Sequence, residues 1–174
     1  MPAVRGLVRR ARLRYAVGIM TAPRRTGPWS PDEIATFLDA QRIPLRLACR
    51  TTSGWPLVAS HWFLRRDGAL WCATQADAKI VRYLAAEPRC GFEVAPDGMP
   101  YRGVRGQGRA AIDPADGPAV LRELVRRYLG DESSGFARWL LGRSATEVAI
   151  RIEPVRMRSW DFSRRMGRGS IPPG

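Results

Sequence analysis

Several residue types are scarce in this sequence of 174 residues. Asparagine is absent, and the chain has one lysine, Lys79, and one histidine, His61. No apolar run approaches the roughly 18 residues that a membrane-spanning helix needs. No sufficient apolar stretch follows the N-terminal arginines to make a secretory signal peptide. We therefore expect neither a membrane anchor nor secretion.

Cysteine is also scarce, with three residues at Cys49, Cys72 and Cys90. Their odd number, wide spacing and lack of a CxxC pair argue against a disulfide framework and against a zinc site. Each lies in an apolar, strand-like run, where a free cysteine packs as a small buried hydrophobe. A cytoplasmic protein without a metal site is expected. No serine has the sequence context of a hydrolase nucleophile, and the sequence identifies no catalytic residue.

Acidic residues are few relative to basic ones, and the net charge is +13 with a pI near 11.3. The excess is uneven: residues 1–30 carry +7, residues 151–174 carry +4, and the longer stretch between them carries +2. Because nearly all basic residues are arginine, the charge is typical of a GC-rich genome's codon bias. The alternative is a charge selected for binding nucleic acid. The near-balanced middle, without a nucleic-acid-binding motif, disfavours that alternative.

The hydrophobic share of 45% and charged share of 26% are typical of one soluble globular domain. Residues 1–29 are rich in arginine and contain no acid, so we predict a disordered basic tail. That segment has other interpretations: a basic arm for an acidic partner, a transit-like segment, or an artefact if translation starts at Met20. The predicted domain spans residues 30–163, and residues 164–174 form a C-terminal tail.

The hydrophobic pattern predicts an antiparallel barrel or sheet of the α+β class. Ser30, Pro31 and Glu33 form a capping box that starts a helix ending near Gln41. The Asp67-Gly68 pair predicts a hairpin turn. The expected strands span residues 44–50, 56–64, 69–73, 89–95, 101–112, 146–152 and 155–160, and further helices span about 78–87, 114–128 and 136–141. Hairpin-linked strands with inserted helices exclude a parallel doubly wound sheet.

The stretch after Thr74 is a candidate phosphate site. A strand ends in Thr74 and leads into a helix that carries Lys79 and Arg82 on one face. A helix start offers free N–H groups and a positive dipole to an anion. The alternative is an ordinary solvated basic surface.

Five segments in order resemble the flavin-binding split-barrel family, the pyridoxamine-phosphate-oxidase-like proteins, which use FMN or F420. The resemblance covers about residues 34–160. It rests on LACRTTSGWPLVASHWFLRRDGALWCAT, KIVRYLAAEPRCGFEV and YRGVRGQGRAAID, then the amphipathic helix, then RIEPVRMRSWDF.

The resemblance implies a six-stranded split β-barrel that forms a homodimer, with the cofactor in a groove between subunits. Thr74 and Lys79, helped by Arg82, match the residues that hold the cofactor phosphate. Ala59, Ser60, His61 and Trp62 match the segment along the isoalloxazine ring. Trp62 and Trp160 are aromatic candidates for ring contact, with core packing as the alternative for both. The predicted cofactor-binding residues are Ala59, Ser60, His61, Trp62, Thr74, Gln75, Lys79, Arg82 and Trp160.

The sequence departs from the family pattern at three places. Asp77 puts a carboxylate where relatives often have a basic or hydroxyl residue, and Tyr83 stands where many have Asn. The basic C-terminal motifs of true pyridoxamine-phosphate oxidases are not matched. These departures argue against an oxidase that acts on a phosphorylated vitamin. They do not decide between FMN and F420 as the cofactor.

The expected function is hydride transfer between FMN or F420 and a small organic substrate. His61 has several possible roles: a proton donor, a haem ligand, a ring-facing hydrogen-bond partner, or an ordinary strand residue. The alternative function is a non-enzymatic module that carries flavin or haem. A basic nucleic-acid-binding protein is the third possibility.

Overall fold

The computed structural model describes residues 22–167 of the chain. Its strands are β1 (Arg24–Thr26), β2 (Leu45–Arg50), β3 (Pro56–His61), β4 (Leu64–Arg66), β5 (Ala69–Gln75), β6 (Arg89–Val94), β7 (Arg102–Asp113) and β8 (Glu147–Asp161). Its helices are α1 (Pro31–Ala40), α2 (Lys79–Ala86), α3 (Gly117–Leu129), α4 (Gly135–Gly142), the 3₁₀ turn η1 (Ser144–Thr146) and α5 (Ser163–Met166).

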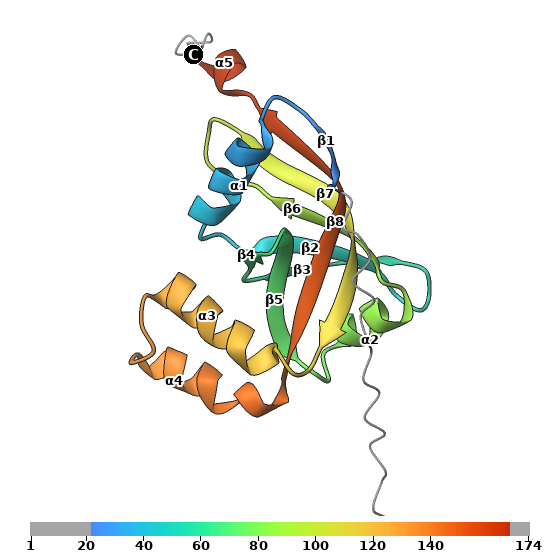
Figure 1. The fold of residues 1–174 in the computed structure, drawn as a ribbon, viewed down its shortest axis with the longest axis vertical. Helices are drawn as coiled ribbons and strands as arrows, with labels where there is room; N and C mark the ends of the chain where they lie inside the picture. The colour runs from blue at the N-terminus through green and yellow to red at the C-terminus, as the bar shows by residue number, and fades with distance from the viewer. Residues whose placement is uncertain (1–21, 168–174) are drawn as a thin grey trace, which may run out of the picture.

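All strands belong to one sheet of the order β3-β2-β6-β7-β8-β5-β4, and β1 pairs with β8 off this path. Every pair is antiparallel except β1 with β8. The sheet curls around a core, yet its edge strands β3 and β4 do not pair with each other (Figure 1). The α+β class and the split-barrel architecture are therefore confirmed.

The strand predicted over residues 56–64 is wrong as a single element. It ends at His61, and β4 begins at Leu64 on the opposite edge of the sheet. The break has a packing cause. The Trp62 ring stacks on Tyr128 with centroids 4.8 Å apart, and the Phe63 N–H donates to Tyr128 Oη at 3.1 Å. These contacts draw the backbone away from β2, so the chain crosses between sheet edges here.

Two further differences concern the ends of the domain. The strands predicted at 146–152 and 155–160 are one strand, β8, because an irregularity in its register with β7, between Gln107 and Gly108, lets the pairing continue past Pro154. Within the predicted tail 1–29, Arg24–Thr26 form β1, so strand structure begins before Ser30. The sheet has eight strands rather than the predicted six. Residues 1–21, including Met20, and 168–174 lie outside the described residues.

The helix capping box and the hairpin turn predicted from the sequence are both present. Ser30 Oγ accepts from the Glu33 N–H at 3.2 Å, and Glu33 Oε2 accepts from the Ser30 N–H at 2.7 Å. Asp67 and Gly68 both have positive φ, 51° and 73°, as a tight hairpin turn requires. Gly106 lies so close to the Arg156 carbonyl and the Phe92 ring that a side chain would clash. Glycine at this position therefore lets β7 pass close to β8 and to the Phe92 ring.

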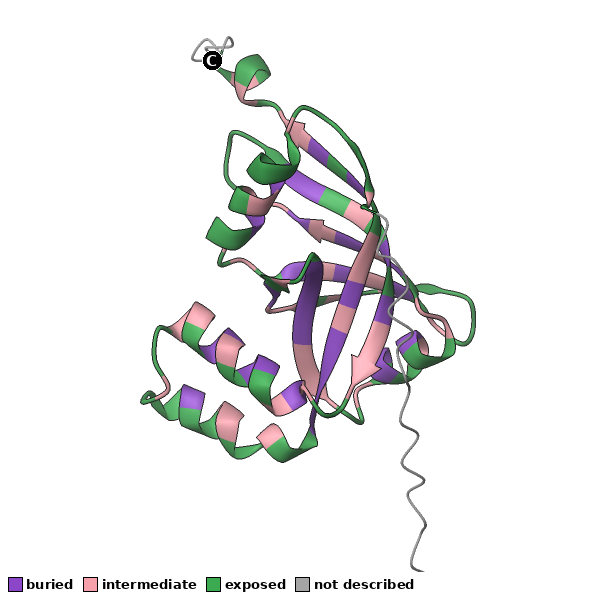
Figure 2. Cartoon of the chain, in the orientation of Figure 1, coloured by how far each residue is buried: buried purple, intermediate pink, exposed green. Residues whose placement is uncertain are grey.

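The core occupies the inside of the curled sheet, and a smaller apolar layer lies under α3 and α4. Figure 2 shows the buried residues along β5, β7 and β8 and on the sheet-facing side of α3. Helix α3 contacts β5 and β8, and α4 packs on α3. Cys49, Cys72 and Cys90 are free and buried, as expected. Within residues 22–167, no helix is long and apolar enough to cross a membrane.

Candidate functional site

A pocket of about 350 Å³ lies where the ends of β3 and β5 meet α3 and α4. Of the nine residues predicted from the sequence, five line it: Ser60, His61, Trp62, Thr74 and Gln75. They come from two segments that the sequence separates by a hairpin. Their convergence makes this pocket the candidate functional site.

His61 ends β3 and is half-buried. Burial lowers the pKa of its imidazole below the ordinary value, so the ring is neutral at physiological pH. Its Nε2 atom is buried and has no hydrogen-bond partner. A buried polar atom without a partner costs free energy, which a ligand with a matching group would recover.

Glu147, the first residue of β8, is 8% exposed and also lines the pocket. Its Oε1 atom accepts from Gln75 Nε2, and Gln75 Oε1 accepts from Thr146 Oγ1 at 2.5 Å. Its Oε2 atom is buried without a partner. Burial raises the pKa of the Glu147 carboxyl, against the opposing influence of Gln75 and Arg143. The pocket therefore holds two unsatisfied polar atoms.

Aromatic rings form one wall of the pocket. Trp62 meets Phe136 edge-on with centroids 6.3 Å apart, and Phe136 stacks on Trp139 at 5.9 Å. Phe136 and Trp139 remain 53% and 55% exposed. The Arg143 guanidinium lies 4.9 Å from the Trp139 ring centroid. This wall suits a planar ring system beside an anionic group.

The turn from β5 into α2 carries the predicted phosphate residues. Helix α2 begins at Lys79 with no side-chain cap. The Val81 N–H in its first turn donates to the Ala78 carbonyl at 3.0 Å, which leaves the Lys79 and Ile80 N–H groups as the candidate donors to an anion. Lys79 and Arg82 are exposed and form no ion pair in the described part of the chain. Asp77, also exposed, directly precedes this helix start.

The remaining predicted residues do not line this pocket. Lys79 and Arg82 lie on α2, a few residues beyond the Thr74-Gln75 wall. Ala59 lies on β3 next to Ser60 but outside the lining. Trp160 lies near the far end of β8, roughly 40 Å along the strand from Glu147, opposite Gly103 and beneath the Arg105 guanidinium. One chain alone does not bring Trp160 to the site.

Sequence reasoning missed the α3, α4 and β8 side of the pocket. The missed residues are Leu121, Leu124, Phe136, Trp139, Leu140, Arg143 and Glu147. Only Glu147 carried a usable signal, as an acid at the start of an otherwise apolar strand. The pocket residues of α3 and α4 fit the ordinary apolar periodicity of amphipathic helices, so the sequence does not mark them as site residues. In the described residues, no group of three or more His, Cys, Asp or Glu side chains is arranged to hold a metal ion.

Comparison with protein-family models and with curated proteins finds no match to this sequence. Solved structures do match. A conserved hypothetical protein from Mycobacterium tuberculosis has a TM-score of 0.70 at 27% identity, over 84% of this chain and 93% of that chain. An F420 reductase has a TM-score of 0.62 at 22% identity, over 74% of this chain and 98% of that chain.

An FAD-binding protein from Mesorhizobium loti also matches, with a TM-score of 0.57 at 22% identity, over 75% of this chain and 93% of that chain. This chain has the flavin-binding split-barrel fold. The resemblance seen in the sequence is confirmed at the level of the fold. A haem storage protein from Vibrio cholerae shares the split barrel, with a TM-score of 0.54 at 17% identity. The fold therefore serves more than one function.

Proposed function

We propose that this split barrel is an oxidoreductase that binds FMN, with F420 as the alternative, and exchanges a hydride with a small organic substrate. One observation carries the proposal: residues matched to the family by sequence converge on one pocket of the fold. The solved structures that share the fold include an F420 reductase and an FAD-binding protein.

The pocket residues fit a flavin or deazaflavin ring. The polar edge of such a ring has an N–H donor and carbonyl acceptors. His61 Nε2 and Glu147 Oε2 are buried atoms that lack a hydrogen-bond partner. A ring edge seated against them would satisfy both atoms, while Trp62 gives an aromatic face for the ring.

The phosphate end of the cofactor fits the start of α2. Thr74 offers a hydroxyl, Lys79 and Arg82 offer unpaired positive charge, and the uncapped amides of α2 add further donors. Asp77 opposes an anion here, but the two cations outnumber it. In this proposal the phosphate lies outside the pocket, beyond Gln75, and the ring lies inside it.

When bound, the cofactor supplies two-electron hydride chemistry. The chain contributes orientation and shelter. Gln75 is held by Glu147 and Thr146, which fixes the pocket wall next to Thr74. Leu121 and Leu124 on α3 make the inner wall apolar and exclude water. The neutral His61 adds a polar group without adding a charge. We assign no catalytic acid or base.

We further propose that the protein is a cytoplasmic homodimer. The three free, buried cysteines suit a reducing compartment. In this dimer, Trp160 of one copy would contact the ring bound by the other copy. This is the ring contact predicted for Trp160, which a single chain does not bring to the site. Sedimentation of the native protein measures the assembly, and a monomer would remove Trp160 from the proposed site.

The phosphate anchor is tested with FMN and riboflavin, which differ by the phosphate group. We expect Lys79→Ala to weaken FMN binding by about 10- to 100-fold, the loss of one charge-assisted hydrogen bond of about 1.5–3 kcal/mol. Riboflavin binding should change little. Fluorescence titration measures both affinities, and Arg122→Ala, an exposed arginine on α3, is the matched control.

Equal weakening of FMN and riboflavin by Lys79→Ala would place the phosphate elsewhere. An absorbance spectrum of protein purified from its native host then decides the class of cofactor. A flavin or deazaflavin band supports the proposal. Absence of binding to both FMN and F420 contradicts it.

The second candidate function is a carrier or sensor that binds flavin or haem without catalysis. Asp77 at the phosphate anchor favours it, as does the haem storage protein among the matching folds. A Soret band in the native protein, lost in His61→Ala, would support a haem carrier over the oxidoreductase.

A further inference from the structure

The phenol of Tyr128 on α3 joins two segments whose strands do not pair in the sheet. Its Oη atom accepts a hydrogen bond from the Phe63 N–H at 3.1 Å and donates one to the Ile43 carbonyl at 3.1 Å. Ile43 lies just before β2, and Phe63 lies in the crossing between β3 and β4. Burial raises the pKa of the Tyr128 phenol, so at neutral pH the hydroxyl keeps the proton that it donates.

The Tyr128 ring supports the candidate pocket from behind. It stacks on the Trp62 ring with centroids 4.8 Å apart and planes 7° from parallel. Trp62 lines the pocket, whereas Tyr128 is not among the lining residues. Trp62 also directly follows His61, whose buried Nε2 atom has no hydrogen-bond partner. Tyr128 therefore contacts the part of the pocket that would hold the ring without itself reaching the space for a ligand.

The crossing after His61 takes its restraints from α3. Residues 62–63 lie between β3 and β4 and pair with no strand. Arg127, next to Tyr128, donates to the carbonyls of Leu38 and Gln41, and its guanidinium lies 5.5 Å from the Phe63 ring centroid. These contacts hold the end of α3 against the end of α1, so the Tyr128 phenol is itself fixed in place.

We propose that Tyr128 is a positioning residue of the flavin site, a role that rests on the proposed function: it orients Trp62, and with it His61, toward the cofactor ring. Side chains that touch a ligand hold a precise geometry only when the residues behind them lock their conformation. The Tyr128 hydroxyl fixes the peptide unit that follows Trp62, and the Tyr128 ring fixes the plane of the indole. Because Tyr128 does not reach the ligand, its effect must pass through Trp62 and His61.

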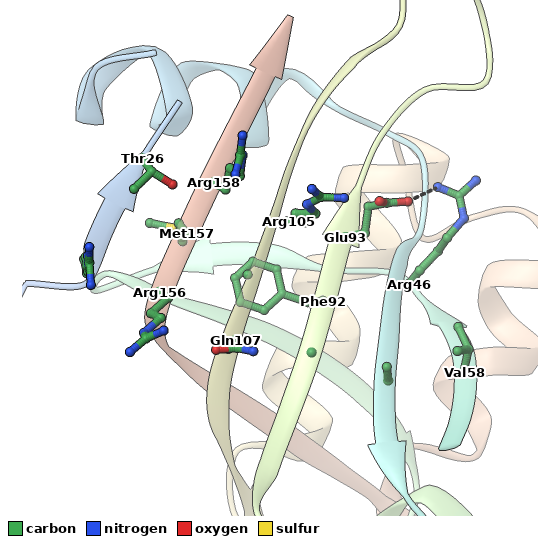
Figure 3. A pocket seen from close by; sticks show the side chains of 14 residues that line it. Thr26, Arg46, Val58, Phe92, Glu93, Arg105, Gln107, Arg156, Met157 and Arg158 are labelled. Atoms are coloured by element: carbon green, nitrogen blue, oxygen red, sulfur yellow. Dashed lines mark ion pairs between the residues drawn. The ribbon is translucent and has the colours of Figure 1, made fainter. Parts of the chain in front are cut away.

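Substitution of Tyr128 leaves the face needed by the proposed dimer unchanged. That dimer requires Trp160, which lies beneath the Arg105 guanidinium on the open face of the sheet. Figure 3 shows this face, with Arg105 and Arg158 on neighbouring strands, and neither Tyr128 nor Trp62 is among its lining residues. A loss of ring binding in a Tyr128 variant is therefore an effect on the pocket and not on that face.

Fluorescence titration with FMN and with riboflavin tests this role on the full chain. Tyr128→Phe keeps the ring and removes the hydroxyl, whereas Tyr128→Leu removes both. We expect Tyr128→Phe to weaken both ligands by about 3- to 10-fold, and Tyr128→Leu to weaken them by at least about 10-fold. Both ligands should be affected alike because they share the ring, whereas Lys79→Ala should weaken FMN alone.

A core substitution away from the pocket is the control for a general loss of stability. Ile34 on α1 is 2% exposed and does not line the pocket. Ile34→Val removes one buried methyl group and destabilises the fold. Its affinity for riboflavin should stay within about twofold of the wild type, because the site is distant. The visible absorbance band of bound FMN should shift in the Tyr128 variants and keep its wild-type position in Ile34→Val.

A double-variant cycle with Trp62→Leu separates positioning from an independent contribution. With Trp62 in place, Tyr128→Leu should weaken riboflavin by at least about 10-fold, but by less than about threefold once Trp62 is leucine. Additive losses would overturn the role, as would an equal loss in Ile34→Val and Tyr128→Phe. Tyr128→Phe decides the outcome alone if Tyr128→Leu does not fold.

The outcomes for Tyr128 and for the proposed function are distinguishable. Wild-type affinity for both ligands in Tyr128→Phe, together with a selective loss of FMN in Lys79→Ala, would overturn the role of Tyr128 and leave the proposed function standing. If the wild-type protein binds F420 instead of FMN, F420 is titrated in its place. A wild-type protein that binds none of these compounds would remove the proposed function and the role of Tyr128 together.

Discussion

Glu147 is the residue whose environment most constrains the candidate site. Its carboxyl is buried, with one oxygen held by Gln75 and the other unpartnered. A carboxyl whose pKa is raised by folding contributes stability below its unfolded value of 4.5, and that contribution is lost as the pH rises above it. At neutral pH the residue therefore destabilises the unliganded protein.

We expect Glu147→Gln to raise the stability of the cofactor-free protein at pH 7 and to have little effect at pH 4. The glutamine keeps an acceptor for Gln75 and removes the buried negative charge. Urea denaturation midpoints of both proteins at the two pH values measure the effect. A stability gain of the same size at both values would show that the charge is not its cause.

At the scale of single residues, sequence reasoning found one side of the pocket. His61, Trp62, Thr74 and Gln75 belong to a contiguous segment whose order resembled a known family, so they were recognisable together. Phe136 and Trp139 come from α4, and Arg143 directly follows it; these residues reach the pocket only because α4 packs on α3. No local pattern distinguishes such residues from an ordinary helix surface.

At the scale of elements, the contact between α3 and β8 positions the pocket. Gly117 opens α3 and lies against the backbone of Glu147 and Val148, with an added Cβ only 2.7 Å from Val148 Cα. The glycine therefore permits close approach of the helix to the strand that carries Glu147. Gly135 opens α4 in a similar position, but nothing lies near its Cβ site.

We expect Gly117→Ala to destabilise the protein by about 1–3 kcal/mol, because the helix must move away from β8. Gly135→Ala should instead stabilise it by up to about 1 kcal/mol, since alanine restricts the unfolded chain and favours helix. Chemical denaturation of the two variants and the wild type gives both values. Destabilisation of similar size in both would mean that helix starts, and not the close approach, set the cost.

Most elements could be predicted from local signals, and the failures have a common cause. The α1 capping box and the Asp67-Gly68 turn depend on neighbours in sequence, and both are present. The break after His61 depends on Tyr128 in α3. The continuity of β8 past Pro154 depends on the facing strand β7. Both features depend on partners far away in the sequence.

At the scale of the whole molecule, the distribution of charge over faces matters more than its distribution along the chain. The stretch of residues 31–150 is nearly neutral in sequence. Folding nevertheless gathers its Arg46, Arg50, Arg89, Arg105 and Arg109 with arginines of β1 and β8 on one face. The net charge summed along the sequence does not reveal this concentration of arginines on one face.

This concentration predicts a salt-dependent stability. Raising NaCl from about 0.05 M to about 0.3 M shortens the screening length and should raise the melting temperature of the wild type, because repulsion among these arginines weakens. The Arg156→Gln, Arg158→Gln double variant should gain less. Thermal melts by circular dichroism measure both, and an identical gain in the two proteins would place the repulsion elsewhere.

The position of β8 in the sheet has a consequence for biosynthesis. This strand pairs with β1, β5 and β7, yet seven strands precede it in the sequence. A growing chain on the ribosome therefore exposes the apolar faces of β5 and β7 until residues 147–161 have left the exit tunnel. Completion of the sheet must therefore follow the emergence of β8, and a nascent chain that lacks β8 presents apolar strands that a chaperone can shield.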